Sequence, residues 1–389
     1  MDSVGIDSSV LRDRSDMVLK NKKPIRIAMI GLRGIPVKAG GIEYTVDHLS
    51  RGLVKLGEEV TVYCRTNCCN PRPKLYKGVK LKYLPTINTK YTESIIHTSL
   101  ATIDATFGKY DIIHYHAMGN GLFSFFPRLF GKKTVVTLHG LDWEREKWGF
   151  IAKTYLKFCE RLIVYFPNSV ISVSRKIKDY YMDKYSKSVE YIPNGVKFEK
   201  SLSITNLRRY GIKKGEYLLF VGRIVPEKGL HYLIEAYKKI NTNIKLVIVG
   251  DSGHTEGYLK ELKALAKGDK NIIFTGPLYD KEKIEAFSNA FFFVLPSTIE
   301  GMPIVVLEAM SYGLCPLVSD IKENMDVIKE NGVHFKNKNV GDLQKQLEYM
   351  ISHKNTIQNI GGRAYDAVKK DYQWGTISKI TNEVYDGLV

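Results

Sequence analysis

Short apolar runs alternate with amphipathic segments along most of this chain. A short run flanked by turn residues predicts a strand that is buried on both faces, as in a parallel sheet. After the first run, apolar residues recur at helical spacing from Val46 to Leu56 and Gly57 follows them, which predicts a helix that ends there. The predicted strands of the first half are residues 25–31, 59–64, 111–115, 134–138 and 170–173, and a further helix is expected from Arg175.

The alternation restarts after a loop-rich stretch in the middle of the chain. The Pro-Asn-Gly sequence at 193–195 and the polar residues up to about Gly215 indicate a domain boundary. In the second half, helices are expected to begin near Gly229 and near Pro303. The predicted strands of this half are residues 217–221, 245–249, 272–275, 291–295 and 316–319.

Strands that alternate with helices in both halves predict an α/β fold with two Rossmann-like parallel-sheet domains. We expect a poorly ordered leader over residues 1–24, a first domain over 25–205, a second domain over 206–370 and a terminal segment over 371–389. Ligands of such sheets bind beyond the carboxyl ends of the strands. A cleft shared by the two domains is therefore the expected site.

The charge of the chain is concentrated in its first half. Residues 1–210 contain 35 Lys and Arg and 19 Asp and Glu, a net charge of +16, whereas residues 211–389 contain 23 and 22, a net charge of +1. A basic half can face nucleic acid, an anionic membrane or an anionic substrate.

The chain contains no run of about 20 apolar residues that would predict a membrane span. Residues 1–24 lack the apolar core of a signal peptide, so a cytoplasmic location is expected. The spacing of the five cysteines fits neither a paired zinc motif nor a small disulfide framework, and we expect free thiols and no metal site. Only the adjacent Cys68 and Cys69 would suit a metal, and then with ligands from elsewhere in the chain.

The most informative segment runs over residues 295–313. A predicted strand ends there, a loop carries Glu300, and Pro303 suits the first turn of a helix. Loop amides before such a helix can face an oxygen-rich ligand. Glu308 falls within the otherwise apolar helix, where a carboxylate needs a partner, either sugar hydroxyls or a nearby Lys or Arg.

Two further loops carry candidate residues for an anionic ligand. Gly40 and Gly41 lie between a predicted strand and a helix, where glycine allows a ligand to approach the backbone. Arg223 and Lys228 follow the first strand of the second half and can clamp a diphosphate. The simpler interpretation of the glycine pair is a tight turn without a ligand. The simpler interpretation of Arg223 and Lys228 is that they are solvated cations that pair with Glu227.

The first half also offers histidines at the ends of strands. His116 leads into a glycine-containing loop and is a candidate hydrogen-bond donor to a reacting sugar, whereas we expect His114 to point into the core. His139 follows the next predicted strand in the same way. The Asp142, Glu144 and Arg145 that come after it would contact an acceptor, or serve as a helix cap and exposed charges.

These motifs resemble glycosyltransferase family 4, whose members have the GT-B fold. The resemblance covers nearly the whole chain after Lys23 and is strongest in the pair Glu300-x7-Glu308, followed by G-R-I-V-P-E-K-G at 222–229. The segment 30–43, I-G-L-R-G-I-P-V-K-A-G-G-I-E, resembles the subset called rhamnosyltransferase-like. The family implies transfer of a hexose or deoxyhexose from a nucleotide-diphosphate sugar, with retention of anomeric configuration and without a metal or other cofactor.

The resemblance implies how a donor diphosphate would be bound and released. Gly40 and Gly41 would approach the diphosphate, and Arg223 and Lys228 would neutralise it as the nucleotide departs. Catalysis by a carboxylate nucleophile needs two carboxyl groups about 5 Å apart, and no such nucleophile is evident near His116. The family's usual proposal is a front-face displacement in which a diphosphate oxygen helps to deprotonate the acceptor.

The resemblance also implies how the sugar and ribose would be held. Glu300 would bind hydroxyl groups of the donor sugar, and Glu308 would bind those of the ribose. His116 would lie near the anomeric centre. Backbone amides beside Glu300 would come from Gly301, Met302, Pro303 and Ile304.

One segment departs from the family pattern. A Gly-Gly pair often follows the position of Asp320, but this chain has Ile-Lys-Glu-Asn at 321–324. Backbone contacts to the donor from that loop are therefore in doubt. The segment 372–389 resembles the helix that returns to the first domain in this family.

The basic first domain would bind the acceptor in this architecture. Residues 123–133 and 148–158 mix aromatic residues with Lys and Arg, which is typical of segments at an anionic membrane surface and also of core helices. We therefore expect a glycan or lipid-linked acceptor in surface polysaccharide or glycoconjugate synthesis, at the inner face of the membrane. The alternatives are a sugar-nucleotide 2-epimerase of the same architecture and, on charge alone, a nucleic-acid-binding protein.

Overall fold

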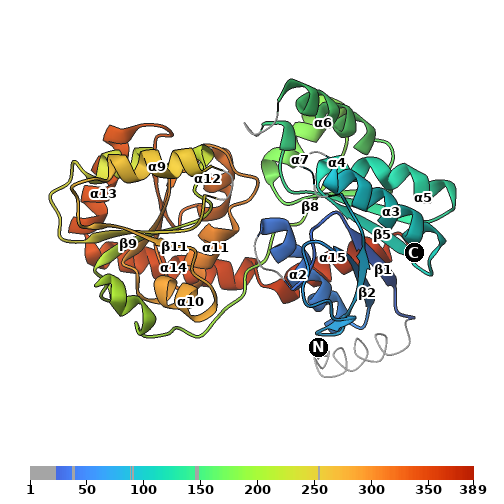
Figure 1. The fold of residues 1–389 in the computed structure, drawn as a ribbon, viewed down its shortest axis with the longest axis horizontal. Coiled ribbons are helices and arrows are strands. Elements are labelled where there is room, and N and C mark those ends of the chain that lie inside the picture. The colour runs from blue at the N-terminus through green and yellow to red at the C-terminus, as the bar shows by residue number, and fades with distance from the viewer. Residues whose placement is uncertain (1–22, 37–39, 88, 90–91, 145–148, 253–254) are drawn as a thin grey trace, which may run out of the picture.

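The computed structural model describes residues 23–36, 40–87, 89, 92–144, 149–252 and 255–389. Two sheets, each covered by helices on both faces, form two bodies that lie side by side (Figure 1). Neighbouring strands are parallel throughout, except in the hairpin of β3 and β4. The predicted α/β fold with two parallel-sheet domains is confirmed.

The first domain contains an eight-stranded sheet in the order β3-β4-β2-β1-β5-β6-β7-β8. Its strands are β1 (Arg26–Ile30), β2 (Glu59–Arg65), β3 (Leu75–Tyr76), β4 (Val79–Leu84), β5 (Ile112–His116), β6 (Lys133–Leu138), β7 (Ser169–Ser172) and β8 (Glu190–Tyr191). Its helices are α2 (Gly41–Lys55), α3 (Glu93–Phe107), α4 (Met118–Gly121), α5 (Phe125–Leu129), α6 (Phe150–Ile163) and α7 (Arg175–Tyr185).

The second domain contains a six-stranded parallel sheet in the order β11-β10-β9-β12-β13-β14. Its strands are β9 (Tyr217–Val221), β10 (Lys245–Val249), β11 (Ile272–Gly276), β12 (Phe292–Leu295), β13 (Pro316–Ser319) and β14 (Val333–Phe335). Its helices are α8 (Leu230–Tyr237), α9 (Glu256–Leu265), α10 (Asp280–Asn289), α11 (Ile304–Ser311), α12 (Lys322–Ile328) and α13 (Val340–Ser352).

Two helices at the end of the chain connect the domains. α14 (Lys354–Asp371) packs against α11 of the second domain, and α15 (Trp374–Asp386) packs against α2 of the first (Figure 1). Tyr385 is fully buried in the first domain, and its hydroxyl lies 2.6 Å from Nδ1 of His114. The final segment therefore ties the second domain to the core of the first.

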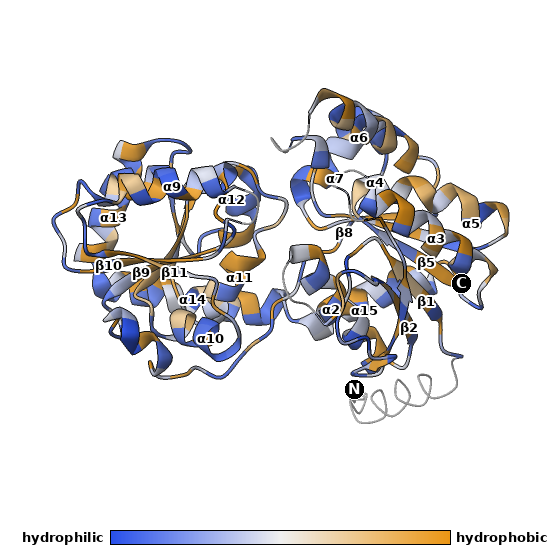
Figure 2. Cartoon of the chain, in the orientation of Figure 1, coloured by the Kyte–Doolittle hydropathy of each residue, from blue (hydrophilic) through white to orange (hydrophobic). Residues whose placement is uncertain are grey.

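The central strands of both sheets are apolar because helices cover both of their faces. Residues 27–30 of β1 and 218–220 of β9 are fully buried, and Figure 2 shows hydrophobic strands in the interior of both domains. Within the described residues, no helix combines the length and the apolarity needed to cross a bilayer.

Candidate active site between the domains

The strand order of each sheet reverses at one point, and ligands of open parallel sheets bind at the carboxyl ends beside that point. In the first sheet it lies between β1, which Gly31 follows, and β5, which ends at His116. In the second sheet it lies between β9 and β12. Arg223 is in the loop after β9 and Glu300 is in the loop after β12. Predicted site residues therefore stand at both reversal points.

The N-termini of α2 and α11 meet where the two domains face each other. A methyl group built on Gly41, the first residue of α2, would lie 3.8 Å from Cδ1 of Ile304, the first residue of α11. Neither terminus has a side-chain cap among the described residues. The first N–H groups of a helix need acceptors and attract anions, so the two termini together favour an anionic group between the domains.

A carboxylate that the sequence did not single out also lies at the start of α2. Glu43 accepts a hydrogen bond from the backbone N–H of Arg33 at 3.2 Å. A methyl group built on Gly40, whose φ is 108°, would lie 2.1 Å from Oε2 of Glu43. Gly40 is therefore required here by its backbone conformation, whereas the flexible Glu43 side chain can turn away from an added Cβ.

Lys228 and Glu300, both predicted site residues, form an ion pair. Nζ of Lys228 lies 2.5 Å from Oε1 of Glu300, and both side chains are largely buried. The backbone N–H of Thr298 donates to the carbonyl of Glu227 at 2.8 Å, which ties together the loops after β9 and β12. The simpler interpretation, in which Lys228 pairs with Glu227, is wrong because Glu300 occupies that role.

Arg223 is the exposed cation of the same region. Among the described residues its guanidinium has no hydrogen-bond or ion-pair partner. The backbone beside it is fixed, because the N–H of Ile224, the next residue, donates to the Asp251 carbonyl. An unpaired guanidinium at the end of a strand is available to a phosphate group.

The two domains touch backbone to backbone beside Glu300. A methyl group built on Gly301 would lie 1.9 Å from the carbonyl oxygen of His139 and 3.5 Å from Cα of Gly140. His139 Nε2 in turn lies 3.2 Å from Nδ1 of His116. The contact therefore brings the predicted His116 and His139 of the first domain next to the Glu300 loop of the second.

His116 is fully buried, and its Nε2 has no hydrogen-bond partner among the described residues. Burial lowers the pKa of His116 well below its usual value, and the charges of His114 and His139 lower it further. The ring is therefore neutral near pH 7, with one nitrogen as a donor and the other as an acceptor. His114 lies in the core as predicted, bonded to Tyr385 and, at 2.7 Å, to Thr137.

The segment after Glu300 supplies fewer amides than the resemblance implies. Pro303 has no N–H, and the N–H of Ile304 already donates to the carbonyl of Met302 at 2.9 Å. Amides without a partner in the described chain are those of Gly301 and Met302. The Met302 sulfur accepts from the backbone N–H of Asn194 at 3.1 Å, which joins this loop to the interdomain connection.

Glu308 lies in α11, as predicted, and has a cationic partner. Nζ of Lys283, on α10, lies 2.7 Å from Oε1 and 3.0 Å from Oε2 of Glu308. The sequence left two kinds of partner open for Glu308, sugar hydroxyls or a nearby cation, and the described residues show the cation, Lys283. Ribose binding by Glu308 stays a prediction.

The predicted acceptor residues lie in or beside a 3-10 turn at Asp142–Glu144. Trp143 Nε1 donates to the buried Glu160 of α6, which anchors the turn, and Glu144 lies 3.3 Å from Nζ of Lys176. Arg145 lies outside the described residues.

The segment that departs from the family pattern forms the start of α12 and contacts the first domain. Lys176 of α7 lies 2.9 Å from Oε1 of Glu323, and Lys322 lies 2.8 Å from Oδ2 of Asp179. The buried Asn324 side chain donates to the carbonyl and hydroxyl of Ser319 at 3.1 and 2.9 Å. This segment is thus the first turn of a helix that docks on the first domain through its side chains.

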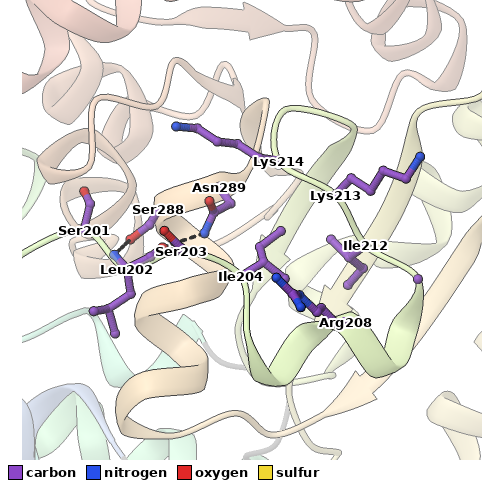
Figure 3. A pocket seen from close by; sticks show the side chains of 11 residues that line it. Ser201, Leu202, Ser203, Ile204, Arg208, Ile212, Lys213, Lys214, Ser288 and Asn289 are labelled. Carbon is purple, nitrogen blue, oxygen red and sulfur yellow. Dashed lines mark hydrogen bonds between the residues drawn. The ribbon is translucent and has the colours of Figure 1, made fainter.

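Two cavities lie apart from this cleft. One, of about 570 Å³, is lined by residues of the interdomain connection, of the segment around Arg208 and Lys213, and of the end of α10 (Figure 3). The other, of about 710 Å³, is lined by residues 66–72. Neither contains a predicted site residue. In the part of the chain that is described, no three His, Cys, Asp or Glu side chains are grouped to hold a metal ion.

Comparisons with known proteins agree with this architecture. A family profile described as "Glycosyltransferase Family 4" matches residues 39–200, and one described as "Glycosyl transferases group 1" matches residues 204–367. An uncharacterised glycosyltransferase of Methanocaldococcus jannaschii is 28% identical over 384 residues, covering 93% of this chain and 98% of that protein.

A second relative is named for its reaction. The Escherichia coli UDP-Gal:alpha-D-GlcNAc-diphosphoundecaprenol alpha-1,3-galactosyltransferase is 33% identical over 243 residues, or 57% of this chain and 60% of that protein. Among solved structures, Anabaena HepE in complex with UDP and glucose aligns with a TM-score of 0.78 at 16% identity, over 93% of this chain and all of HepE. That likeness bears on the fold alone.

The fold and these matches define a glycosyltransferase with the GT-B architecture. The two profiles match consecutive halves of the chain in the order of its two domains. The chain belongs to the family 4 type of glycosyltransferase, and it is a transferase enzyme. The rhamnosyltransferase-like subset stays a prediction, and these matches give no support to the epimerase alternative.

Proposed function

We propose that this enzyme moves a hexose or deoxyhexose from a nucleotide-diphosphate sugar to a glycan or lipid-linked acceptor in surface polysaccharide or glycoconjugate synthesis. The observation that carries the donor assignment is the meeting of Gly41 and Ile304 at the N-termini of two helices across the cleft. A diphosphate at these termini would receive backbone N–H groups from the start of α2 and from Gly301 and Met302 in the loop before α11. The name of the Escherichia coli relative, which includes UDP-Gal as the donor, supports the same class of donor.

The departing diphosphate would be stabilised by protein charges. Arg223 offers a guanidinium without a partner among the described residues, and Lys228 offers an ammonium held by Glu300. Positive groups that meet the charge developing on a leaving group lower the barrier without a metal ion. Metal-independent transfer is therefore part of the proposal.

Retention of configuration fits a front-face displacement. The acceptor oxygen bonds to the anomeric carbon on the face from which the diphosphate oxygen leaves, and that oxygen takes the acceptor's proton. Glu300 would bind donor hydroxyls rather than attack, because its carboxylate is already engaged by Lys228. The neutral His116 would face the sugar with its unpartnered Nε2.

A lipid-linked acceptor is supported by the outer surface of the first domain. Phe150 and Ile151 at the start of α6 are 85% and 84% exposed, and the single acidic residue of this helix, Glu160, is buried. Figure 2 shows hydrophobic segments on α5 and α6 at the outside of this domain. Such a mixture of apolar and basic residues suits the face of an anionic bilayer. The exposed side chains of α6 are Phe150, Ile151, Thr154, Lys157, Phe158 and Arg161.

A transfer assay tests the proposal. The enzyme is incubated with UDP-, GDP-, ADP- or dTDP-sugars, a chelator and polyprenyl-diphosphate-linked sugars, and the products are resolved by mass spectrometry and NMR. We expect nucleoside diphosphate release coupled to glycosylated lipid, with the anomeric configuration of the donor. Release of an isomerised donor, or an inverted product, would contradict the proposal.

A further inference from the structure

All five cysteines are thiols in the structure, and three of them lie near the end of β2 or in the loop after it: Cys64, Cys68 and Cys69. Cys64 is fully buried, whereas Cys69 is partly exposed and lines the cavity of about 710 Å³ formed by residues 66–72. A methyl group built on Gly34 would lie 2.5 Å from Sγ of Cys69 and 3.2 Å from Sγ of Cys64. The two sulfurs therefore lie next to each other beside Gly34.

The thiols of Cys64 and Cys69 interact directly. A hydrogen bond with Cys69 is the largest cause, and burial the second, of a raised pKa at Cys64. Cys64 is therefore protonated at neutral pH. Sγ of Cys68 lies elsewhere, 3.4 Å from Oδ1 of Asn67 and 3.8 Å from Oε1 of Glu93. The pair consists of a buried thiol and an accessible one, and Cys68 is outside it.

Cys69 also contacts the loop after β1. The carbonyl oxygen of Arg33 accepts a weak hydrogen bond from Sγ of Cys69 at 3.9 Å and another from the backbone N–H of Arg65 at 2.8 Å. The N–H of Arg33 donates to Glu43, in the first turn of α2, at 3.2 Å. The backbone of Arg33 therefore links the thiol pair to the N-terminus of α2.

We propose that Cys64 and Cys69 are an oxidisable pair, which hydrogen peroxide converts to a disulfide that loosens the contact of Arg33 with the start of α2. The accessible Cys69 sulfur bonds to one peroxide oxygen, the O–O bond breaks, and a sulfenic acid and one water result. The Cys64 sulfur then attacks the sulfenic sulfur, and the hydroxyl group leaves with the Cys64 proton as a second water. Two thiols are oxidised by two electrons, which reduce one peroxide.

The disulfide changes the surroundings of Arg33. Cys64 is held in the sheet by the pairing of β2 with β4, so Cys69 must move towards it when a covalent bond replaces the hydrogen bond. The disulfide has no S–H group, and the hydrogen bond from Cys69 to the Arg33 carbonyl is lost. The change reaches the start of α2, where the proposed function places the donor diphosphate.

A purely structural role for the two cysteines makes a different prediction. Sulfurs that only fill space would not react as a pair. The accessible Cys69 would then be oxidised alone, to a sulfenic acid or beyond it to a sulfinic acid. Only a reactive pair gives a disulfide between these two positions that a thiol reductant reverses.

The test is oxidation of the whole folded chain with hydrogen peroxide, followed by thiol titration after unfolding and non-reducing peptide mapping by mass spectrometry. We expect the wild type to fall from five titratable thiols to three, with a Cys64–Cys69 disulfide that dithiothreitol reverses. Cys69→Ser, at a partly exposed position, should form no disulfide. Cys68→Ser is the matched control, because it changes the neighbouring thiol outside the pair, and it should form the same disulfide as the wild type.

Hydrogen–deuterium exchange measures the coupling to α2. In the oxidised wild type, exchange at Arg33 and at the start of α2 should be roughly 2- to 10-fold faster, as for the loss of one hydrogen bond, and should slow again after reduction. The inference is overturned if no disulfide forms, if the disulfide includes Cys68, or if exchange at these positions is unchanged. These measurements use no donor, so failure of the proposed donor site would leave their outcome as it is.

Discussion

Four histidines of the first domain are held neutral by their surroundings. Burial is the largest cause in each case, and it lowers the pKa of His48 and of His97 to about 4 and that of His114 to about 3. The pKa of His116 is also well below its usual value. Since the unfolded chain binds protons to histidine below about pH 6.5, protonation of these residues does not affect stability at neutral pH but opposes folding in mild acid.

Stability should therefore fall as pH drops from 6.5 towards 4. His97 is fully buried, and neither of its ring nitrogens has a partner among the described residues. We expect it alone to remove about 1.4 kcal/mol of unfolding free energy by pH 5.5, as one pKa unit corresponds to that amount. Urea unfolding of His97→Leu at pH 7.5 and 5.5 should show a smaller pH dependence than the wild type.

The exposed His353 provides the control, since His353→Gln should keep the wild-type pH dependence. Equal pH dependence in the wild type and His97→Leu would show that the buried ring does not titrate in this way.

The loop before α11 determines how closely the domains approach. Gly301 has a φ outside the left-handed region, so the obstacle to a side chain there is contact and not backbone conformation. A Cβ would meet the His139 carbonyl at 1.9 Å, and either the loop or the domain must move.

Gly301→Ala should lower kcat/KM roughly 10- to 100-fold, because displacement of about 1 Å at a site has effects of that size. Its melting temperature should change little, since the domains can separate without unfolding. Gly257→Ala is the matched control, because a Cβ on this exposed glycine of α9 meets nothing within 4 Å. Wild-type kinetics for Gly301→Ala would contradict the close contact.

The exposed face of α6 gives a prediction at the scale of one helix. The double variant Phe150→Asp, Ile151→Asp removes two strongly exposed apolar side chains and adds negative charge. In flotation with phosphatidylcholine vesicles containing phosphatidylglycerol, we expect at least tenfold weaker binding than the wild type, from lost apolar burial and charge repulsion.

Tyr279→Asp changes a residue of the second domain that is also exposed, and should bind vesicles as the wild type does. If the α6 variant binds vesicles as well as the wild type, or if the wild type does not bind them, α6 is not a membrane-binding helix and does not support a lipid-linked acceptor.

Arrangement of the whole molecule depends on contacts between α7 and α12. Glu323 is 5% exposed and paired with Lys176, which also reaches Glu144 beside the predicted acceptor residues. Removal of one partner leaves a buried charge unpaired, which costs more than the loss of an exposed pair. The Lys322–Asp179 pair of the same interface is exposed on both sides.

Lys176→Met should therefore shift the molecule towards an open arrangement, with a larger radius of gyration in small-angle X-ray scattering and roughly tenfold lower kcat/KM. Lys322→Met removes the exposed pair and should change both quantities much less. The account of this interface is wrong if the two variants behave alike.

Much of the fold could be predicted because central parallel strands are continuous apolar runs. β4 is not predicted, because its residues alternate between buried and exposed from Val79 to Lys82 and do not form an apolar run. The alternation arises because β4 lies near the edge of the sheet, where only the two-residue β3 follows it. In the sequence, a short segment of alternating apolar and polar residues near a sheet edge cannot be distinguished from a polar loop. β14, at the edge of the second sheet, is too short to give a pattern.

The candidate site was predicted residue by residue, but its pairings were not. Lys228 and Glu300 were each expected in the cleft, and 72 residues separate them along the chain. Lys283, Lys176 and Glu323 were not singled out, because each is an ordinary surface charge in its own segment and gains a role only from the helix packed against it. The unusual 321–324 segment was the one available signal for the α12 contact.

The central claim is that a nucleotide-diphosphate sugar binds between the domains without a metal. Its most direct test is thermal unfolding of the wild type, Lys228→Ala, Glu308→Ala and Lys281→Met, which changes an exposed lysine of α10, with UDP-, GDP-, ADP- and dTDP-sugars and a chelator. We predict that donors of one base class stabilise the wild type and Lys281→Met, by about 2.7 kcal/mol at a hundred times Kd, and that both cleft variants lose most of this effect. No stabilisation of the wild type by any donor, or equal stabilisation of all four proteins, would contradict the claim.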